Sequence, residues 1–432
     1  MFAAACLATS PLSAQTKAEL TERVAELEQA LSAARTALDA ATEREAQAAK
    51  RATLAEEQLA QEKTAPTQPR IRLGDLAVGG AVRTNFYGGD YSSAGLARDM
   101  NRGEAGTISL DTFRINADYA HGPWVGKFEY RFYPGYSASN SDGYSFLHTA
   151  WLGYDFENGD QVQVGVNRVP FGPGPYGISQ SWFFDQHYYV GLADDMDLGV
   201  KYVAQRGDWS LDFAYYYSGE GSYLGENFSR DSVRYSYDVV NETGEGYEER
   251  NQFNLRAIYA TDLGSGLTVD LGASAQYGML QSHGEQDDGE HYALSFHPVF
   301  KWSNWTLATQ MTYYKYDIDG YVDTTDDGID NPTDTLVQVG GYDFPTFVAT
   351  RAWVAGASLS YYNEIDVVDW LDYVMPYVEY SSIMKEEPGF NNSDLFIIGA
   401  AWSRGGWYIY TEVAASNGND FIGDEAGYGD PT

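Results

Sequence analysis

Most of the chain after Leu73 consists of segments of roughly 9 to 14 residues in which apolar and polar side chains alternate. In residues 111–120, DTFRINADYA, Phe113 and Ile115 alternate with Arg114 and Asn116. Because successive side chains of a strand point to opposite faces, each such strand has one apolar and one polar face. Soluble sandwiches use strands of about five or six residues, whereas tilted membrane-spanning strands need about 9 to 11. The lengths therefore favour an all-β, transmembrane antiparallel β-barrel.

The connections between these segments alternate in length, which supports the same interpretation. Long loops begin near residues 88, 134, 169, 219, 281, 317 and 385, and short turns fall near His121, Glu157, Arg206, Asp262, Ser303, Glu364 and Arg404. Outer-membrane barrels have short periplasmic turns and longer external loops. A Greek-key sandwich gives no reason for such a regular alternation.

The number of segments is about fifteen, and the last covers residues 406–415. Single-chain bacterial barrels have an even number of strands. Because fifteen is an odd number, the sequence predicts a sixteen-stranded barrel over residues 73–432 whose last strand is missing from this sequence. The alternative is that one strand has escaped notice in the acidic stretch between Gly219 and Arg250.

The first residues have the composition of a secretory signal. Residues 1–14 contain a short apolar run and end in Leu-Ser-Ala, a plausible cleavage site, so we interpret them as the remnant of a signal peptide. Cys6 is the only cysteine, and a lipoprotein signal is a weaker alternative. No window of about 20 apolar residues exists, so the sequence predicts no spanning helix.

Residues 16–62 contain no Gly or Pro and repeat apolar positions in heptads, which predicts a periplasmic α-helical coiled coil. A single solvated helix is the alternative. Two prolines within residues 63–72 indicate a linker. The predicted seam of the coiled coil contains Leu20, Val24, Leu27, Leu31, Leu38 and Leu59.

The formal charge of -35 excludes the basic face that nucleic-acid binding requires. Disordered acidic chains are poor in aromatic residues, whereas 15% of this chain is aromatic. No nucleophile elbow, phosphate loop or metal-ligand spacing of the histidines is present, so we expect neither an enzyme nor a cofactor.

The stretch RVPFGPGPYGISQSWFFDQ, residues 168–186, combines three prolines with three consecutive aromatic residues. Proline excludes a helix or a central strand there, and the aromatics are too apolar for a solvated loop. We interpret residues 169–194 as the third long loop, folded into the lumen as a constriction; contact with a neighbouring subunit or an outer loop is the alternative. Arg168 and Asp185 are the charges of this loop that are expected to face solute. The residues predicted to form the constriction are Arg168, Pro170, Phe171, Gly172, Trp182, Phe183, Phe184 and Asp185.

Period-two placement also predicts charges that line the lumen, because lysine or arginine facing lipid would cost about 2–4 kcal/mol at the bilayer midplane. Many of these residues could instead pair structurally across neighbouring strands. They are Arg114, Asp118, Lys127, Glu129, Arg131, Lys201, Asp212, Arg256, Asp270 and Lys301.

An acidic segment from Asp317 to Asp334 carries seven aspartates. Asp323, Asp327 and Asp334 have some of the spacing of a Ca²⁺ loop, but the final glutamate and the flanking helices are absent. A solvated external loop is the simpler interpretation, and specific Ca²⁺ binding is a weak alternative.

Residues 164–172, VGVNRVPFG, followed by DDMDLGVKY at residues 194–202, resemble the phosphate-selective porin O/P family. With its coiled coil, the whole architecture is also similar to the related dicarboxylate porins of the bacterial outer membrane. The resemblance implies homotrimers and uptake of small anionic solutes. A ladder of pore arginines cannot be matched, so phosphate selectivity is not carried over.

The sequence therefore predicts an outer-membrane porin: a passive diffusion channel for small hydrophilic solutes, including anionic ones. Its other expected partners are membrane lipid and lipopolysaccharide. The alternative is a structural anchor whose coiled coil engages the periplasm or the cell wall.

Overall fold

The computed structural model describes residues 71–89, 107–134, 144–219, 234–241, 246–320, 334–342, 344–365 and 367–419. All of them lie in the compact unit Ala65–Thr432. The signal remnant, the coiled coil with its predicted seam, and the linker up to residue 70 lie outside the described residues. In the described part, no helix is long and apolar enough to span a membrane.

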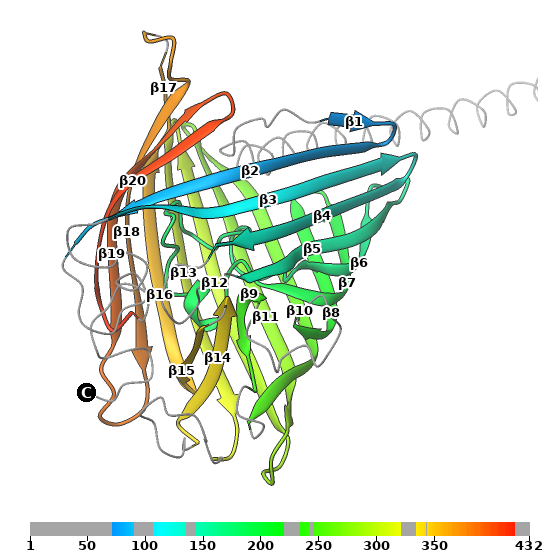
Figure 1. The fold of residues 1–432 in the computed structure, drawn as a ribbon, viewed down its shortest axis with the longest axis vertical. Helices are drawn as coiled ribbons and strands as arrows, with labels where there is room; N and C mark the ends of the chain where they lie inside the picture. The colour runs from blue at the N-terminus through cyan, green and yellow to red at the C-terminus, as the bar shows by residue number, and fades with distance from the viewer. Residues whose placement is uncertain are drawn as a thin grey trace, which may run out of the picture. The chain divides into compact units, whose positions relative to one another are not determined.

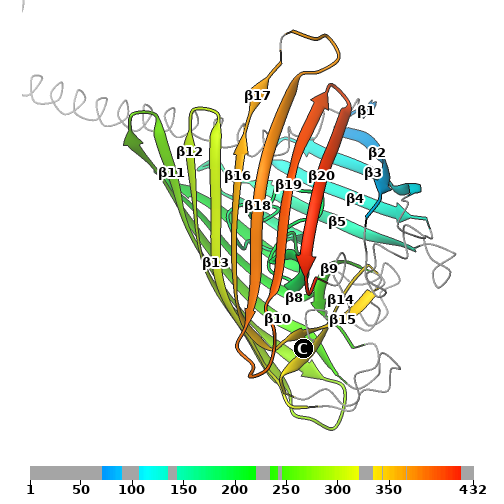
Figure 2. The same cartoon turned by 90° about the vertical axis from the view of Figure 1, so that its left-hand side faces the viewer.

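Long antiparallel strands curl into a barrel, and most of them pair with the next strand along the chain (Figures 1 and 2). The wall strands are β2 (Leu76–Tyr87), β3 (Thr107–His121), β4 (Trp124–Tyr133), β5 (Tyr144–Asp155), β6 (Gln161–Arg168), β7 (Met196–Arg206), β8 (Trp209–Gly219), β10 (Tyr247–Gly264), β11 (Leu267–Ser282), β12 (Gly289–Trp302), β13 (Trp305–Asp317), β16 (Arg351–Tyr361), β18 (Tyr373–Lys385), β19 (Ser393–Arg404) and β20 (Trp407–Asn417).

The 17-stranded sheet also contains β1 (Ile71–Leu73) and β17 (Asn363–Glu364), short pieces that pair with β2 and β18. Without these two, fifteen wall strands remain, as the sequence analysis counted. A sixteenth wall strand is not among the described residues.

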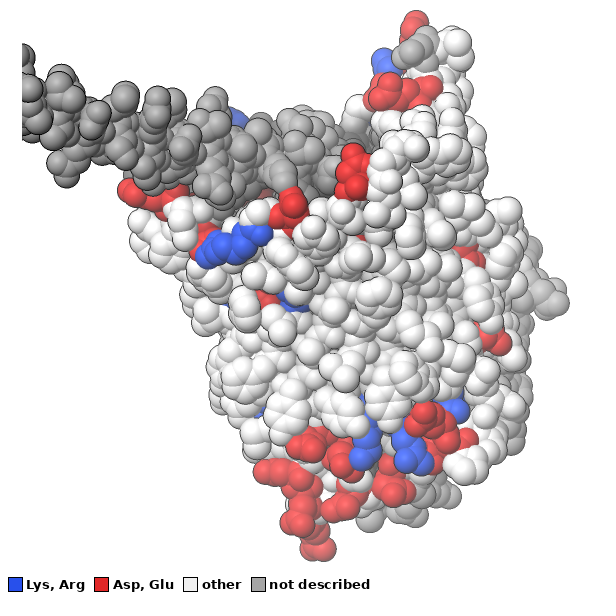
Figure 3. Space-filling view, turned by 180° about the vertical axis from the view of Figure 1, so that it is seen from behind, with Lys and Arg blue, Asp and Glu red and all other residues white. Residues whose placement is uncertain are grey.

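Side chains along the wall alternate between an exposed outer face and an enclosed inner face. On β11, Leu271 and Tyr277 are exposed, whereas Ser274 and Gln276, on the other face, are buried. Figure 3 shows charged side chains gathered toward two ends of one side of the molecule, with a broad, mostly uncharged band between them. An uncharged band of this kind is what the hydrocarbon core of a bilayer requires.

Aromatic pairs lie near both ends of the strands, as expected at the two membrane–water interfaces. On β13, Trp305 lies at the short-turn end and Tyr313 toward the other, about 26 Å apart along the strand at 3.3 Å per residue. At the short-turn end, ring-centroid distances are 5.1 Å for Trp124–Tyr154, 4.9 Å for Trp209–Tyr259 and 4.7 Å for Trp305–Tyr361. Toward the long-loop end, they are 5.1 Å for both Tyr215–Phe253 and Tyr313–Trp353.

A second, 3-stranded sheet was not predicted from the sequence. It contains β9 (Arg234–Val239), β14 (Leu336–Tyr342) and β15 (Phe344–Ala349), which come from two long loops. All six residues of β9 are buried. The acidic stretch 219–250 therefore does hold an extra strand, but this strand belongs to the small sheet and does not change the number of wall strands.

Candidate functional site

The third long loop follows β6 and leads to β7 through the 3-10 helix η1 (Tyr188–Val190). Just before it, Gly165 has φ +125°, and a Cβ there would lie 2.2 Å from the Ala150 carbonyl oxygen on β5. Only glycine fits this distortion of β6, which comes three residues before Arg168. Pro170 and Pro173 then prevent the chain from continuing the sheet.

The loop lies on the inner side of the barrel, because its polar contacts are with inward-facing side chains of distant strands. Gly172 donates its N–H to Ser274 Oγ on β11 at 3.1 Å. Gln186 donates its N–H to Ser381 Oγ on β18 at 3.0 Å. By strand order, β18 lies across the barrel from β6, so the loop spans the interior from one wall to the other.

Two carboxyl groups, one on β18 and one on β20, hold the middle of the loop. Glu379 on β18 accepts hydrogen bonds from Ser179 Oγ at 2.6 Å, from the Gln180 N–H at 2.6 Å and from Ser358 Oγ at 2.9 Å. Glu412 on β20 accepts the Trp182 N–H at 3.0 Å. Buried backbone donors require acceptors, and the carboxyl oxygens of Glu379 and Glu412 accept these bonds, so these two residues fix the path of the loop.

Asp185 does not face the solute passage, which corrects the prediction made from the sequence. It is 1% exposed, and its carboxylate lies 2.6 Å from His187 Nδ1. The other ring nitrogen of His187 lies 3.1 Å from Thr312 Oγ1 on β13. Asp185 therefore orients a buried histidine that attaches the end of the loop to the wall.

The three consecutive aromatic residues of the loop have different surroundings. Phe184 stacks on Tyr188 with ring centroids 4.2 Å apart, and Tyr188 packs edge-on against Tyr237 of β9 at 5.4 Å. Trp182 and Phe183, which pack on each other at 5.0 Å, are only partly buried. The small sheet thus packs on the aromatic end of the loop, and Trp182 remains near the interior space.

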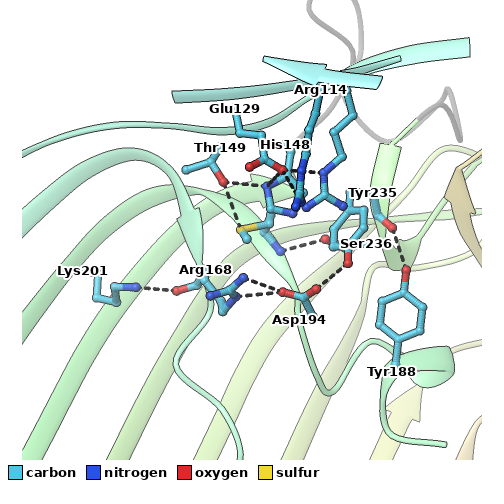
Figure 4. A network of polar contacts seen from close by, with 12 residues as sticks. Arg114, Glu129, His148, Thr149, Arg168, Tyr188, Asp194, Lys201, Tyr235 and Ser236 are labelled. Carbon is cyan, nitrogen blue, oxygen red and sulfur yellow. Dashed lines mark hydrogen bonds and ion pairs between the residues drawn. The ribbon is translucent and has the colours of Figure 1, made fainter. Parts of the chain in front are cut away.

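Figure 4 shows a polar network where the loop meets the wall formed by β3 to β7. Arg168 Nη2 lies 2.7 Å from Asp194 Oδ1, and Tyr235 donates its hydroxyl to the other oxygen of Asp194. Burial raises the pKa of Asp194, although the charge of Arg168 opposes that rise. Lys201 donates to the carbonyl oxygen of Arg168 at 2.7 Å.

Glu129 on β4 lies beside two arginines and a histidine. Arg131 Nε donates to it at 2.6 Å, Arg114 lies 3.6 Å away, and His148 Nδ1 lies 3.8 Å away. Arg131 is itself 9% exposed and lies over the Tyr235 ring at 4.4 Å. The side chain of Arg114 is 32% exposed, so Arg114 presents its charge to the interior space.

The remaining predicted lumen charges lie on the same inner face. Arg256 pairs with Asp212 at 2.7 Å, and Lys201 interacts electrostatically with the same carboxylate. The other four predicted lumen charges form two pairs across neighbouring strands. Asp118 lies opposite Lys127 in the β3–β4 register, and Asp270 lies 3.1 Å from Lys301.

The two sides of the interior differ in exposure. Where the loop packs, the inward-facing Ser274, Thr312 and Glu379 are buried. On the side of β2, β3 and β20, the side chain of Arg83 is 37% exposed and Tyr410 is 38% exposed. The inner face formed by β20, β2 and β3 therefore borders open space inside the barrel.

A scan against models of known protein families finds no match, and a search of curated proteins finds none either. Solved structures do match. OmpF of Salmonella typhi, in complex with daunomycin, is similar with a TM-score of 0.50 and 12% identity over 82% of this chain and 96% of that chain. The chain has a porin fold.

Two further solved structures are similar to this chain, with lower TM-scores than OmpF. The outer membrane channel DcaP of Acinetobacter baumannii gives 0.42 at 10% identity over 79% of this chain and 97% of that chain. An anion-selective porin from Comamonas acidovorans gives a TM-score of 0.40 at 12% identity, over 76% of this chain and 83% of that chain.

Sequence reasoning missed the residues of β18 and β20 that hold the loop. Glu379 and Glu412 lie on strands whose alternation marks them as inward-facing, but nothing local indicates that they bind loop backbone. Tyr235 was missed because the segment around it carries no clear strand pattern. Of the weak Ca²⁺ candidates, Asp323 and Asp327 lie outside the described residues, and Asp334 is exposed.

One acidic cluster in the described residues could hold a cation. Asp195, Asp197 and Asp238 each place one carboxylate oxygen within 4.8 Å of the others, and all three are buried. Arg234 lies 2.8 Å from Asp238 and supplies positive charge there.

Proposed function

We propose that this protein is a passive diffusion channel of the bacterial outer membrane for small hydrophilic solutes. The observation that carries the proposal is the loop that crosses the barrel interior and packs against one part of the wall, while inward side chains of β2, β3 and β20 stay partly exposed. Residues 169–194 would set the narrowest part of that passage. An uncharged outer band between two aromatic zones supports a membrane location.

The passage is proposed to favour anions. On the side of the open space, Arg114 and Arg131 share the single carboxylate of Glu129. Glu379 and Glu412 are engaged by the loop. The excess positive charge therefore lies beside the open space, where it raises the local concentration of anions.

The proposal includes a homotrimer in contact with lipid and lipopolysaccharide, with the N-terminal coiled coil in the periplasm. The homotrimer comes from the sequence resemblance, and the coiled coil comes from the heptad pattern of residues 16–62. The mass of the detergent-solubilised complex, measured by light scattering, would test the trimer.

Single-channel recording in planar bilayers tests the function. We expect discrete conductance steps in KCl and a reversal potential of the anion-preferring sign in a tenfold salt gradient. Absence of steps from a folded, heat-modifiable complex would refute the channel. A cation-preferring reversal potential would refute only the anion preference.

A further inference from the structure

The open passage is bordered by aromatic rings with arginines beside them. Tyr176, in the loop, is 40% exposed, and the Arg168 guanidinium carbon lies 5.2 Å from its ring centre. Arg83 on β2 lies 5.4 Å from the ring centre of Trp182. We call the following residues the aromatic ledge: Tyr176, Trp182, Tyr410, Arg83 and Arg168.

Residues of four different segments make up the aromatic ledge. Tyr410 lies on the same face of β20 as Glu412, which binds the loop, so Tyr410 points inward. Both Tyr176 and Arg83 lie close enough to Tyr410 to interact with it electrostatically. The ledge thus brings together β2, β6, β20 and the loop beside the open space.

The backbone holds Tyr176 in a fixed position. Gly177 donates its N–H to the Gly174 carbonyl oxygen at 3.3 Å, which closes a β-turn with Pro175 and Tyr176 at its centre. Proline is favoured at the second position of such turns because its φ is already set. Gly177 has φ +63°, which suits glycine. An exposed ring on a rigid turn can bind a solute with little loss of conformational entropy.

We propose that the aromatic ledge is a binding site for flat aromatic carboxylates; this inference rests on the proposed channel function. Aromatic rings attract each other in offset or edge-to-face geometry. Arginine stacks on aromatic faces and attracts a carboxylate at the same time. A solute with a flat ring and a carboxylate therefore meets both partners at once, whereas a puckered ring of the same charge meets only the arginine.

The test compares benzoate with cyclohexanecarboxylate, which has the same charge and nearly the same size but a puckered ring. Each anion is added to single channels of the full-length protein in KCl, and dwell times of current blocks are measured. We expect benzoate blocks to last roughly two- to tenfold longer, the factor that an aromatic pair supplies. Equal dwell times for the two anions would overturn the proposal.

Variants of the exposed tyrosine separate a stacking role from a structural one. Tyr176→Leu should abolish the difference between the two anions, and Tyr176→Phe should retain it. Tyr277→Leu is the matched control, because Tyr277 is an exposed tyrosine on the outer face of β11; it should behave as the unmodified protein. A difference that persists in Tyr176→Leu would also overturn the proposal.

The KCl conductance keeps the two proposals distinguishable. If the folded protein forms no channels in KCl, the channel function fails. If channels form and benzoate behaves like cyclohexanecarboxylate, the channel function stands and only the aromatic ledge is refuted.

Discussion

The two sides of the barrel interior are built differently, although both come from strands with the same alternation. Where the loop packs against β11, β13 and β18, the inward side chains Ser274, Thr312 and Glu379 are buried. Against β2 to β4 the inward side chains include Arg83 and Arg114, which remain partly exposed. One side binds the loop, and the other borders the open space.

The difference follows from the needs of a buried loop backbone. N–H groups taken out of water must find acceptors, and Ser274 Oγ and Glu379 supply them. A wall that water can reach has no such requirement and can carry paired arginines at low cost, because solvent screens their charges.

Removing the loop should have the largest effect on this comparison. Replacing residues 173–190 with a short Gly-Ser connection should raise the single-channel conductance severalfold, because the obstacle between the two walls is gone. Heat-modifiable migration on a gel would confirm that the barrel has folded. An unchanged conductance in a folded variant would show that the loop does not limit the pore.

Two arginines that share one carboxylate should respond differently to the same substitution. Arg131→Gln leaves Glu129 buried without its closest cation and should destabilise the barrel by about 3–5 kcal/mol. Thermal unfolding in detergent micelles measures this loss. Arg114→Gln, at the exposed position, should leave the unfolding temperature nearly unchanged and reduce the anion preference in reversal-potential measurements. Equal destabilisation by both substitutions would contradict the division into a buried and an exposed arginine.

Removing the carboxyl group that binds the loop to β18 should increase the motion of the loop more than it lowers the stability of the barrel. Glu379→Ala leaves the Gln180 N–H without its acceptor and should cost about 1–3 kcal/mol locally. We expect frequent fluctuations of the open-channel current. The control Glu364→Ala removes an exposed glutamate of a short turn and should leave the current quiet. A quiet current in both variants would show that Glu379 is dispensable for loop position.

The smallest expected effect concerns a turn distant from the loop. Asp160 accepts a hydrogen bond from Arg206 Nη2 at 2.6 Å, and the bonds from Arg206 hold the pKa of Asp160 below its usual range. Its contribution to stability is therefore present above the unfolded-state pKa of about 4 and is lost as the pH falls through the lower folded-state pKa.

Asp160→Asn should cost about 1 kcal/mol at neutral pH, since the half-exposed Arg206 is screened by solvent. The loss relative to the unmodified protein should shrink below about pH 4. Unfolding temperatures of both proteins across pH 2 to 7 would measure it, and a pH-independent difference would contradict an ionic role for Asp160.

The sequence predicted the wall well and the interior incompletely. Period-two alternation located strands such as β3 and β11 and placed Arg114 and Asp212 on the inner face, because successive side chains of a strand point to opposite faces. The small sheet formed by β9, β14 and β15 was not predicted, since short strands inside long acidic loops lack a repeated pattern. Asp185 was assigned to the solute passage because local sequence does not reveal that His187 lies beside it.

The sequence by itself determined that the chain forms a barrel and which face of each strand turns outward, because a period of two acts locally. Only the tertiary structure decided which residues hold the loop and where the interior stays open. Those contacts join residues far apart in the chain, such as Gln180 and Glu379, and only the folded barrel brings them together.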